Sequence, residues 1–138
     1  MRDIKLRFWD KENKSMVYQD KESLYPTGLY KIICDDFTNF QFRLFRLKDN
    51  IFNQFVEVES VKMEYTGFKN EKGVEIYEGD LLVDRNDLEE VGKVFFEEGC
   101  FQVQWDGIAE NLFENCDVYE VIGNIYENSN LLEGANND

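Results

Sequence analysis

Three glycines at intervals of six residues, Gly67, Gly73 and Gly79, constrain the fold of this chain more than any other feature. They lie between aromatic and β-branched residues in the segment 65–80. Glycines in such surroundings are typical of tight turns between short strands. The segment therefore predicts a small all-β fold, and it contains no recognisable catalytic constellation.

The second half of the chain continues this pattern. A buried strand is predicted at 81–83, a charged loop at 85–90, a hairpin of the strands 91–96 and 100–105, and a last strand around Gly123. On the strand 100–105, Phe101, Val103 and Trp105 share one face, and Asp106-Gly107 is a strong hairpin signal. Because closure protects the edges of short strands, we expect a small SH3-like, partly open barrel over 65–128 and a polar tail over 129–138, in which Leu131 and Leu132 form a short helical turn.

The first half predicts additional strands, which either extend the barrel or form a second lobe within a single domain of 138 residues. Residues 4–9 alternate as a strand, 10–14 form a polar turn, and 16–18 return as the hairpin partner. The segment 19–60 is a variable insert, irregular over 19–31. Strands are favoured over a short helix at 32–58, with a β-bulge where the apolar phase slips between Leu44 and Phe45, and 55–63 is predicted to be one strand.

The net charge of −14 is confined to one half of the chain. Residues 1–64 carry 11 basic and 11 acidic side chains, whereas residues 65–138 carry 4 and 18. A surface with so few cations repels nucleic-acid phosphates and anionic membranes. The acidity either serves solubility or provides a docking face for a basic partner.

The rare residue types argue against several kinds of chemistry. There is no histidine, so a histidine-based triad is excluded. Cys34, Cys100 and Cys116 are widely spaced, so we expect no structural zinc and interpret the thiols as small buried hydrophobes in a reducing cytosol. The carboxylates of Glu75, Glu78 and Asp80 could bind a metal, but we favour a turn-forming role for Asp80. We predict no catalytic residues, no metal and no cofactor.

Four blocks of sequence resemble the YopX family of phage and prophage proteins. They follow the family's order along nearly the whole chain: Ile4–Lys14 with Met16–Tyr18; Tyr65–Gly73 with Glu75–Asp80; Gly92–Val94 with Gly99–Phe101 and Trp105–Asp106; and Glu120–Asn128. The resemblance is weak over 19–60, and Phe8 departs from the alanine common in the family. It implies a mostly β fold with an SH3-like barrel, a mobile-element origin and hence the cytoplasm of a phage host, but no established activity.

Aromatic and charged residues of these blocks are the candidate binding residues. Arg7, Trp9 and Asp10 form either a ligand clamp or, as we favour, a structural group in which Trp9 fills the barrel mouth and Arg7 pairs with a carboxylate. Tyr65, Tyr77 and Trp105 complete the set.

These observations favour a non-enzymatic module that binds a protein partner or a second copy of itself, with no membrane partner. One alternative is an acidic DNA mimic that inhibits a host nucleic-acid-binding protein. Another is nucleic-acid binding through the barrel, where Arg43, Arg46 and Lys48 with Phe42 and Phe45 form a basic-aromatic patch, although the net charge opposes it.

Overall fold

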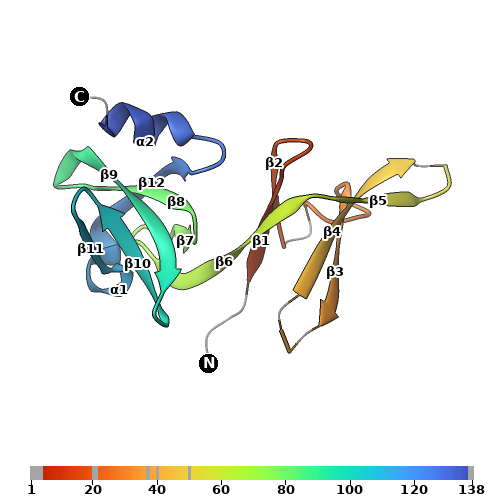
Figure 1. Cartoon of the computed structure of the whole chain (residues 1–138), viewed down its shortest axis with the longest axis horizontal. Coiled ribbons are helices and arrows are strands. Elements are labelled where there is room, and N and C mark those ends of the chain that lie inside the picture. Colours follow the sequence, from red (N-terminus) through yellow and green to blue (C-terminus); the bar gives the residue numbers. More distant parts are fainter. Residues whose placement is uncertain (1–4, 20–21, 37, 40, 50, 137–138) are drawn as a thin grey trace. The chain divides into compact units, whose positions relative to one another are not determined.

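The computed structural model describes residues 5–19, 22–36, 38–39, 41–49 and 51–136, and over these the chain is mainly β, as predicted (Figure 1). The elements are β1 (Leu6–Asp10), β2 (Ser15–Tyr18), β3 (Tyr30–Asp36), β4 (Gln41–Asp49), β5 (Gln54–Val58), β6 (Ser60–Lys69), β7 (Glu75–Tyr77), β8 (Asp80–Asp84), β9 (Asp87–Glu97), β10 (Cys100–Trp105), β11 (Ile108–Asn111), α1 (Leu112–Asn115), the 3-10 helix η1 (Cys116–Val118), β12 (Tyr119–Asn124) and α2 (Ser129–Asn136).

The described chain forms two compact units, which are treated separately below. The N-terminal unit spans Lys5–Met63, and the C-terminal unit begins at Glu64. The chain passes from one unit to the other within β6, a strand of the four-stranded sheet with the order β2-β1-β6-β7.

In the N-terminal unit, β1 and β2 form the predicted hairpin, with Phe8 opposite Val17. Strands β3, β4 and β5 form an antiparallel sheet in that order. Ile32, Leu44 and Val58 lie opposite one another on these three strands and share one face. This face packs with the β1–β2 hairpin into a core of buried residues: Leu6, Phe8, Val17, Tyr30, Leu44 and Val58.

Three sequence expectations for this unit need correction or confirmation. Strands, not a helix, occupy the described parts of 32–58, as favoured; Phe40 lies outside the described residues.

The register of β4 is continuous between Leu44 and Phe45, so the predicted bulge is misplaced: β4 slips against β5 between Leu47 and Asp49 instead. The single strand predicted at 55–63 is two strands, because the chain breaks at Glu59, where the backbone carbonyl accepts a hydrogen bond from the Lys11 N–H (2.9 Å).

In the C-terminal unit, five antiparallel strands follow the order β11-β10-β9-β8-β12 and curl into a half-barrel (Figure 1). The predicted hairpin is present, with Phe101 opposite Phe96 and Val103 opposite Val94. Its inward residues join a core that also contains residues from β7, β8, α1, η1 and β12: Ile76, Leu82, Val94, Phe101, Val103, Trp105, Leu112, Cys116 and Tyr119. The finer expectation of an SH3-like barrel stays a prediction.

Two turns of this unit differ from expectation. Gly67 is not in a turn: it lies inside β6, where the pairing with β7 slips between Tyr65 and Lys69. The charged loop predicted at 85–90 is a two-residue turn, since β8 ends at Asp84 and β9 begins at Asp87.

The predicted helical turn at the tail is the eight-residue helix α2, which packs against β9. Within the described residues, no helix has the length and apolarity needed to cross a membrane. Among the thiols, Cys116 is buried as expected and Cys100 is half-buried, but Cys34 is exposed, so the expectation of three buried cysteines is wrong for Cys34.

Candidate functional site

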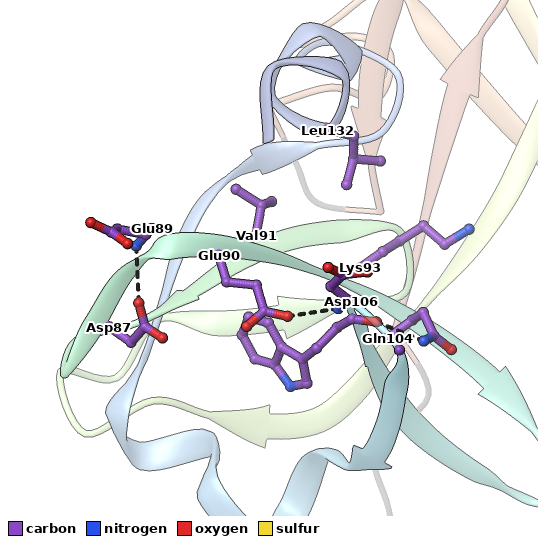
Figure 2. A pocket seen from close by; sticks show the side chains of 10 residues that line it. Asp87, Glu89, Glu90, Val91, Lys93, Gln104, Asp106 and Leu132 are labelled. Atoms are coloured by element: carbon purple, nitrogen blue, oxygen red, sulfur yellow. Dashed lines mark hydrogen bonds between the residues drawn. The ribbon is translucent and has the colours of Figure 1, made fainter. Parts of the chain in front are cut away.

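The C-terminal unit contains a cleft of about 600 Å³, here called the Trp105 cleft (Figure 2). Its lining comes from β9, the end of β10, the turn after β10, and α2. The lining residues are Asp87, Glu89, Glu90, Val91, Lys93, Gln104, Trp105, Asp106, Gly107 and Leu132. In Figure 2, Leu132 of α2 and Val91 of β9 point toward each other across the cleft, so its apolar walls come from two elements distant in sequence.

Trp105 lines the cleft from the core face of the sheet, whereas the alternation of side chains along β9 and β10 puts Val91, Lys93 and Gln104 on the opposite face. Gln104 lies opposite Lys93, so Trp105 follows at the level of Gly92. A Cβ on Gly92 would lie 2.6 Å from Val103 Cγ1 and 2.8 Å from Trp105 Cζ3. The missing side chain at Gly92 therefore creates the space in which the indole ring lies across β9, as aromatic residues often cover glycines in sheets.

Hydrogen bonds and ring contacts fix the orientation of Trp105. Its indole N–H donates to Glu110 Oε1 at 2.9 Å, and the Tyr119 hydroxyl donates to the same oxygen. The rings of Trp105 and Tyr119 meet edge to face at 5.4 Å. Burial, together with the negative charge of Glu110, raises the pKa of Tyr119, so its hydroxyl remains a donor at neutral pH. The orientation of the indole is thus fixed by a half-buried carboxylate and by Tyr119.

Carboxylates dominate the rim of the cleft. A smaller hollow of about 190 Å³ lies beside it and shares Asp87, Glu90 and Trp105, and its other lining residues are Asp84, Ile108 and Glu110. Together the two hollows are lined by six acidic side chains and one lysine, Lys93. Glu90 accepts a hydrogen bond from the Asp106 N–H at 2.6 Å, which ties β9 to the β10–β11 turn. Within the described residues, no group of three or more acidic, cysteine or histidine side chains is arranged to hold a metal ion.

The candidate residues Arg7, Trp9 and Asp10 lie together on β1, and all three are buried. The Arg7 guanidinium donates to the Tyr18 hydroxyl at 3.5 Å across the hairpin and lies 5.9 Å from the centre of its ring. Asp10 accepts hydrogen bonds from the Tyr30 hydroxyl (2.8 Å) and from the β1–β2 turn. These contacts join elements within the N-terminal unit.

Tyr65 and Tyr77 face each other on β6 and β7, with ring centres 5.5 Å apart, and both are buried in the C-terminal unit. Nearby, the Asp80 carboxylate accepts a hydrogen bond from the Tyr77 N–H at 2.7 Å, the turn-forming role that the sequence favoured. Of the six candidate residues, Trp105 alone lines the two hollows described above. The sequence thus pointed to one residue of the site.

The basic-aromatic patch expected for nucleic-acid binding is divided between the two faces of the β3–β4–β5 sheet. Phe42 and Arg46 have the same parity along β4 as the core residue Leu44, whereas Arg43 and Phe45 have the opposite parity. Arg43 also forms ion pairs with Asp35 (3.4 Å) and Glu57 (3.0 Å). The structure does not bring these residues together as one surface.

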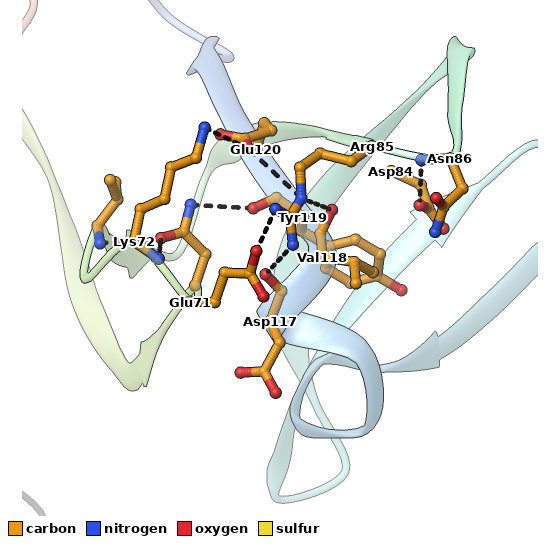
Figure 3. Close-up of polar contacts among 11 residues, drawn as sticks. Glu71, Lys72, Asp84, Arg85, Asn86, Asp117, Val118, Tyr119 and Glu120 are labelled. Atoms are coloured by element: carbon orange, nitrogen blue, oxygen red, sulfur yellow. Dashed lines mark hydrogen bonds and ion pairs between the residues drawn. The ribbon is translucent and has the colours of Figure 1, made fainter.

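A second polar cluster of the C-terminal unit surrounds Arg85 in the β8–β9 turn (Figure 3). Its guanidinium forms an ion pair with Glu71 and donates to the Asp117 carbonyl at 3.0 Å, while Lys72 pairs with Glu120 at 3.3 Å. The charge of Arg85 lowers the pKa of Glu71 through a direct hydrogen bond. The cluster joins the β6–β7 and β8–β9 turns to η1 and β12. Since its cations are already paired with local acids, it offers little to a ligand.

Comparison with known proteins agrees with this architecture. The YopX protein family matches residues 5–133. The chain belongs to the YopX family. The crystal structure of protein EF1440 from Enterococcus faecalis is similar over 96% of this chain and 99% of that one, with 27% sequence identity and a TM-score of 0.58. None of the curated proteins searched matches this YopX family member.

Most residues of the cleft of this YopX family member were not predicted from the sequence. Asp87, Glu89 and Glu90 fall in the segment that was predicted to be a charged loop. A signal was present in Gly92, a glycine inside a strand that precedes a tryptophan-containing strand, because such a glycine often marks a close approach. The contribution of Leu132 could not be foreseen, since nothing local indicates where α2 packs.

Proposed function

We propose that this YopX family member is a non-enzymatic interaction module that binds a basic segment of a protein partner in the Trp105 cleft. The observation that carries the proposal is the lining itself: an indole and two aliphatic side chains surrounded by carboxylates, with one lysine. Among the lining residues there is no thiol, hydroxyl or imidazole that could act as a nucleophile or be paired with a base. This set is suited to binding.

A lysine or arginine side chain matches this lining in both of its parts. Its aliphatic stem can pack on Val91 and Leu132, while its cationic head reaches the acidic rim. The surrounding charge supports the same partner. From Glu64 to Asp138 the chain has 4 basic and 19 acidic residues, which speeds the approach of cations and repels phosphates.

The test is a binding titration with a labelled peptide of alternating arginine and glycine, followed by fluorescence anisotropy. We expect the double variant Glu89→Lys/Asp106→Asn to weaken binding about tenfold or more, the loss of roughly 1.4 kcal/mol. The matched control, Glu114→Lys/Asp117→Asn, makes the same change in net charge at exposed positions outside the cleft lining. Equal weakening by both variants would show that only net charge matters and would refute a cleft-specific site.

A DNA mimic is a second interpretation of the acidity. Six acidic side chains line the two hollows, whereas a mimic would present its charges on a convex face to a DNA-binding groove. The binding module and the DNA mimic predict different outcomes in a competition experiment. A mimic would release DNA from host DNA-binding proteins in a gel-shift assay, and the Glu89→Lys/Asp106→Asn variant would reduce that release no more than its control does. Affinity capture from lysogenic cells would then identify the natural partner.

A further inference from the structure

Strand β5 is an outer strand of the N-terminal sheet. The order β3-β4-β5 leaves one of its edges outside the sheet, and within the described residues β5 pairs with β4 alone. Edges of this kind present unpaired backbone groups and are ready templates for another strand. Proteins usually protect such edges with charges, bulges, prolines or covering segments.

The other edge of the same sheet, β3, shows such protection. It ends in Asp35 and Asp36, its register slips between Cys34 and Asp36, and Leu24 forms a parallel bridge to Tyr30 at its start. In contrast, β5 contains a single charge, Glu57, which is neutralised by Arg43 at 3.0 Å. The register slip of β4 against β5 lies between Leu47 and Asp49, close to the turn, so the middle of β5 remains regular.

Exposed apolar side chains accompany this edge. In the turn that leads into β5, Ile51 is 82% exposed and Phe52 is 76% exposed, and within β5 itself Val56 is 45% exposed. Tyr25 contacts both the turn and the strand: its hydroxyl donates to Asn53 Oδ1 at 3.2 Å, and its ring packs edge to face on Phe55. Val56 is thus the exposed apolar residue of the strand itself, with Ile51 and Phe52 in the turn at its start, and exposed apolar groups of this kind usually mark an interface.

The charge distribution indicates what kind of partner fits this edge. Residues Lys5–Met63 contain 10 basic and 9 acidic side chains, so the N-terminal unit is nearly neutral, unlike the strongly acidic C-terminal unit. A neutral partner surface of the same apolar character is therefore the best match, and a second copy of the unit supplies it. A strand edge is also complementary to itself when two copies meet antiparallel about a twofold axis.

We propose that the protein dimerises by antiparallel pairing of β5 with β5 of a second copy, centred on Val56. The pairing would join two three-stranded sheets into one of six strands and cover both copies of Val56. The inference is independent of the proposed cleft function, because it involves only residues of the N-terminal unit.

The test is the mass of the full chain in solution, measured by light scattering and sedimentation over a range of concentrations. We expect a dimer of twice 16.4 kDa, and we expect Val56→Lys to raise its dissociation constant at least tenfold, since a lysine at an edge opposes pairing. The matched control is Val74→Lys, which changes a valine of similar exposure (43%) in the C-terminal unit. Circular dichroism checks that both variants are folded.

Site-directed crosslinking tests the twofold register directly and does not depend on the lysine variant. In a Cys34→Ser background, Val56→Cys should be crosslinked to its own copy by a short bismaleimide, whereas Val74→Cys and the background should not. A wild-type chain that stays monomeric at all concentrations would overturn the proposal. A dimer insensitive to Val56→Lys, or crosslinks equally strong at positions 56 and 74, would also overturn it.

Discussion

At the scale of single residues, Asp10 is a buried carboxylate with several hydrogen-bond donors. It accepts hydrogen bonds from the Tyr30 hydroxyl (2.8 Å), the Asn13 side chain (2.8 Å) and the backbone N–H groups of Glu12 and Asn13. Burial alone would raise the pKa of Asp10, but these donors outweigh it and hold the pKa below its usual value. The residue thus joins the β1–β2 turn to the start of β3.

We predict that Asp10→Asn lowers the free energy of unfolding by about 1–3 kcal/mol at pH 7, because the donors lose a charged acceptor. The folded-state pKa of Asp10 lies below its unfolded value of about 3.9, so its stabilisation is complete above that pH and fades as the pH falls through the folded value. The difference between wild type and variant should therefore shrink below about pH 4. Urea unfolding at several pH values measures it.

Asp36 provides the matched control for this prediction. Its carboxylate accepts from the Thr38 and Asn39 N–H groups and from the Asn39 side chain (2.6 Å), the same turn pattern as at Asp10, but it has no tyrosine donor and is less buried. We expect Asp36→Asn to cost clearly less stability. Equal losses at the two positions would show that the contact with Tyr30 contributes nothing.

At the scale of elements, Asn70 connects the β6–β7 turn to β12. Its side-chain oxygen accepts from the Lys72 (2.9 Å) and Val74 (3.0 Å) N–H groups, and its amide donates to the Tyr119 carbonyl at 3.1 Å. Because Asn70 is buried, each of these backbone groups would lose its partner if the side chain were removed.

We predict that Asn70→Ala destabilises the protein by about 1–3 kcal/mol and speeds amide hydrogen exchange at Lys72 and Val74. Asn86→Ala is the control, since Asn86 is exposed in a turn of the same unit and its backbone N–H, which the substitution keeps, donates to Asp84 Oδ1 at 2.8 Å. Unchanged exchange at Lys72 and Val74 in the Asn70 variant would contradict the role assigned to this side chain.

The same elements show how far sequence reasoning reaches. Gly67, Gly73 and Gly79, all predicted to lie in turns, adopt positive φ of 89°, 83° and 89°. The spacing could not tell a chain reversal at Gly73 from the slipped register at Gly67, because both need the same backbone angle. Hairpins with local turn signals, such as the one at Gly99, were predicted correctly. The Trp105 cleft was not, because it depends on how α2 packs on β9.

At the scale of the whole molecule, the two units differ sharply in charge although they belong to one chain. The excess of 15 acids from Glu64 to Asp138 is opposed by few cations, of which Arg85 and Lys72 are already engaged in exposed ion pairs. Exposed pairs of this kind contribute little to stability. Repulsion among the remaining carboxylates must therefore oppose folding, and binding of a basic partner would relieve it.

We predict that sodium chloride stabilises the free protein, because screening weakens this repulsion. Relief of about 1 kcal/mol would raise Tm by roughly 4 °C between low and moderate salt. Near pH 4.4, where the net charge vanishes, the same salt should have little effect, which makes pH an internal control. Thermal unfolding followed by circular dichroism measures both. A fall of Tm with salt at pH 7 would show that attractive pairs such as Arg85–Glu71 outweigh the repulsion among the carboxylates. A basic partner would then have no net repulsion to relieve.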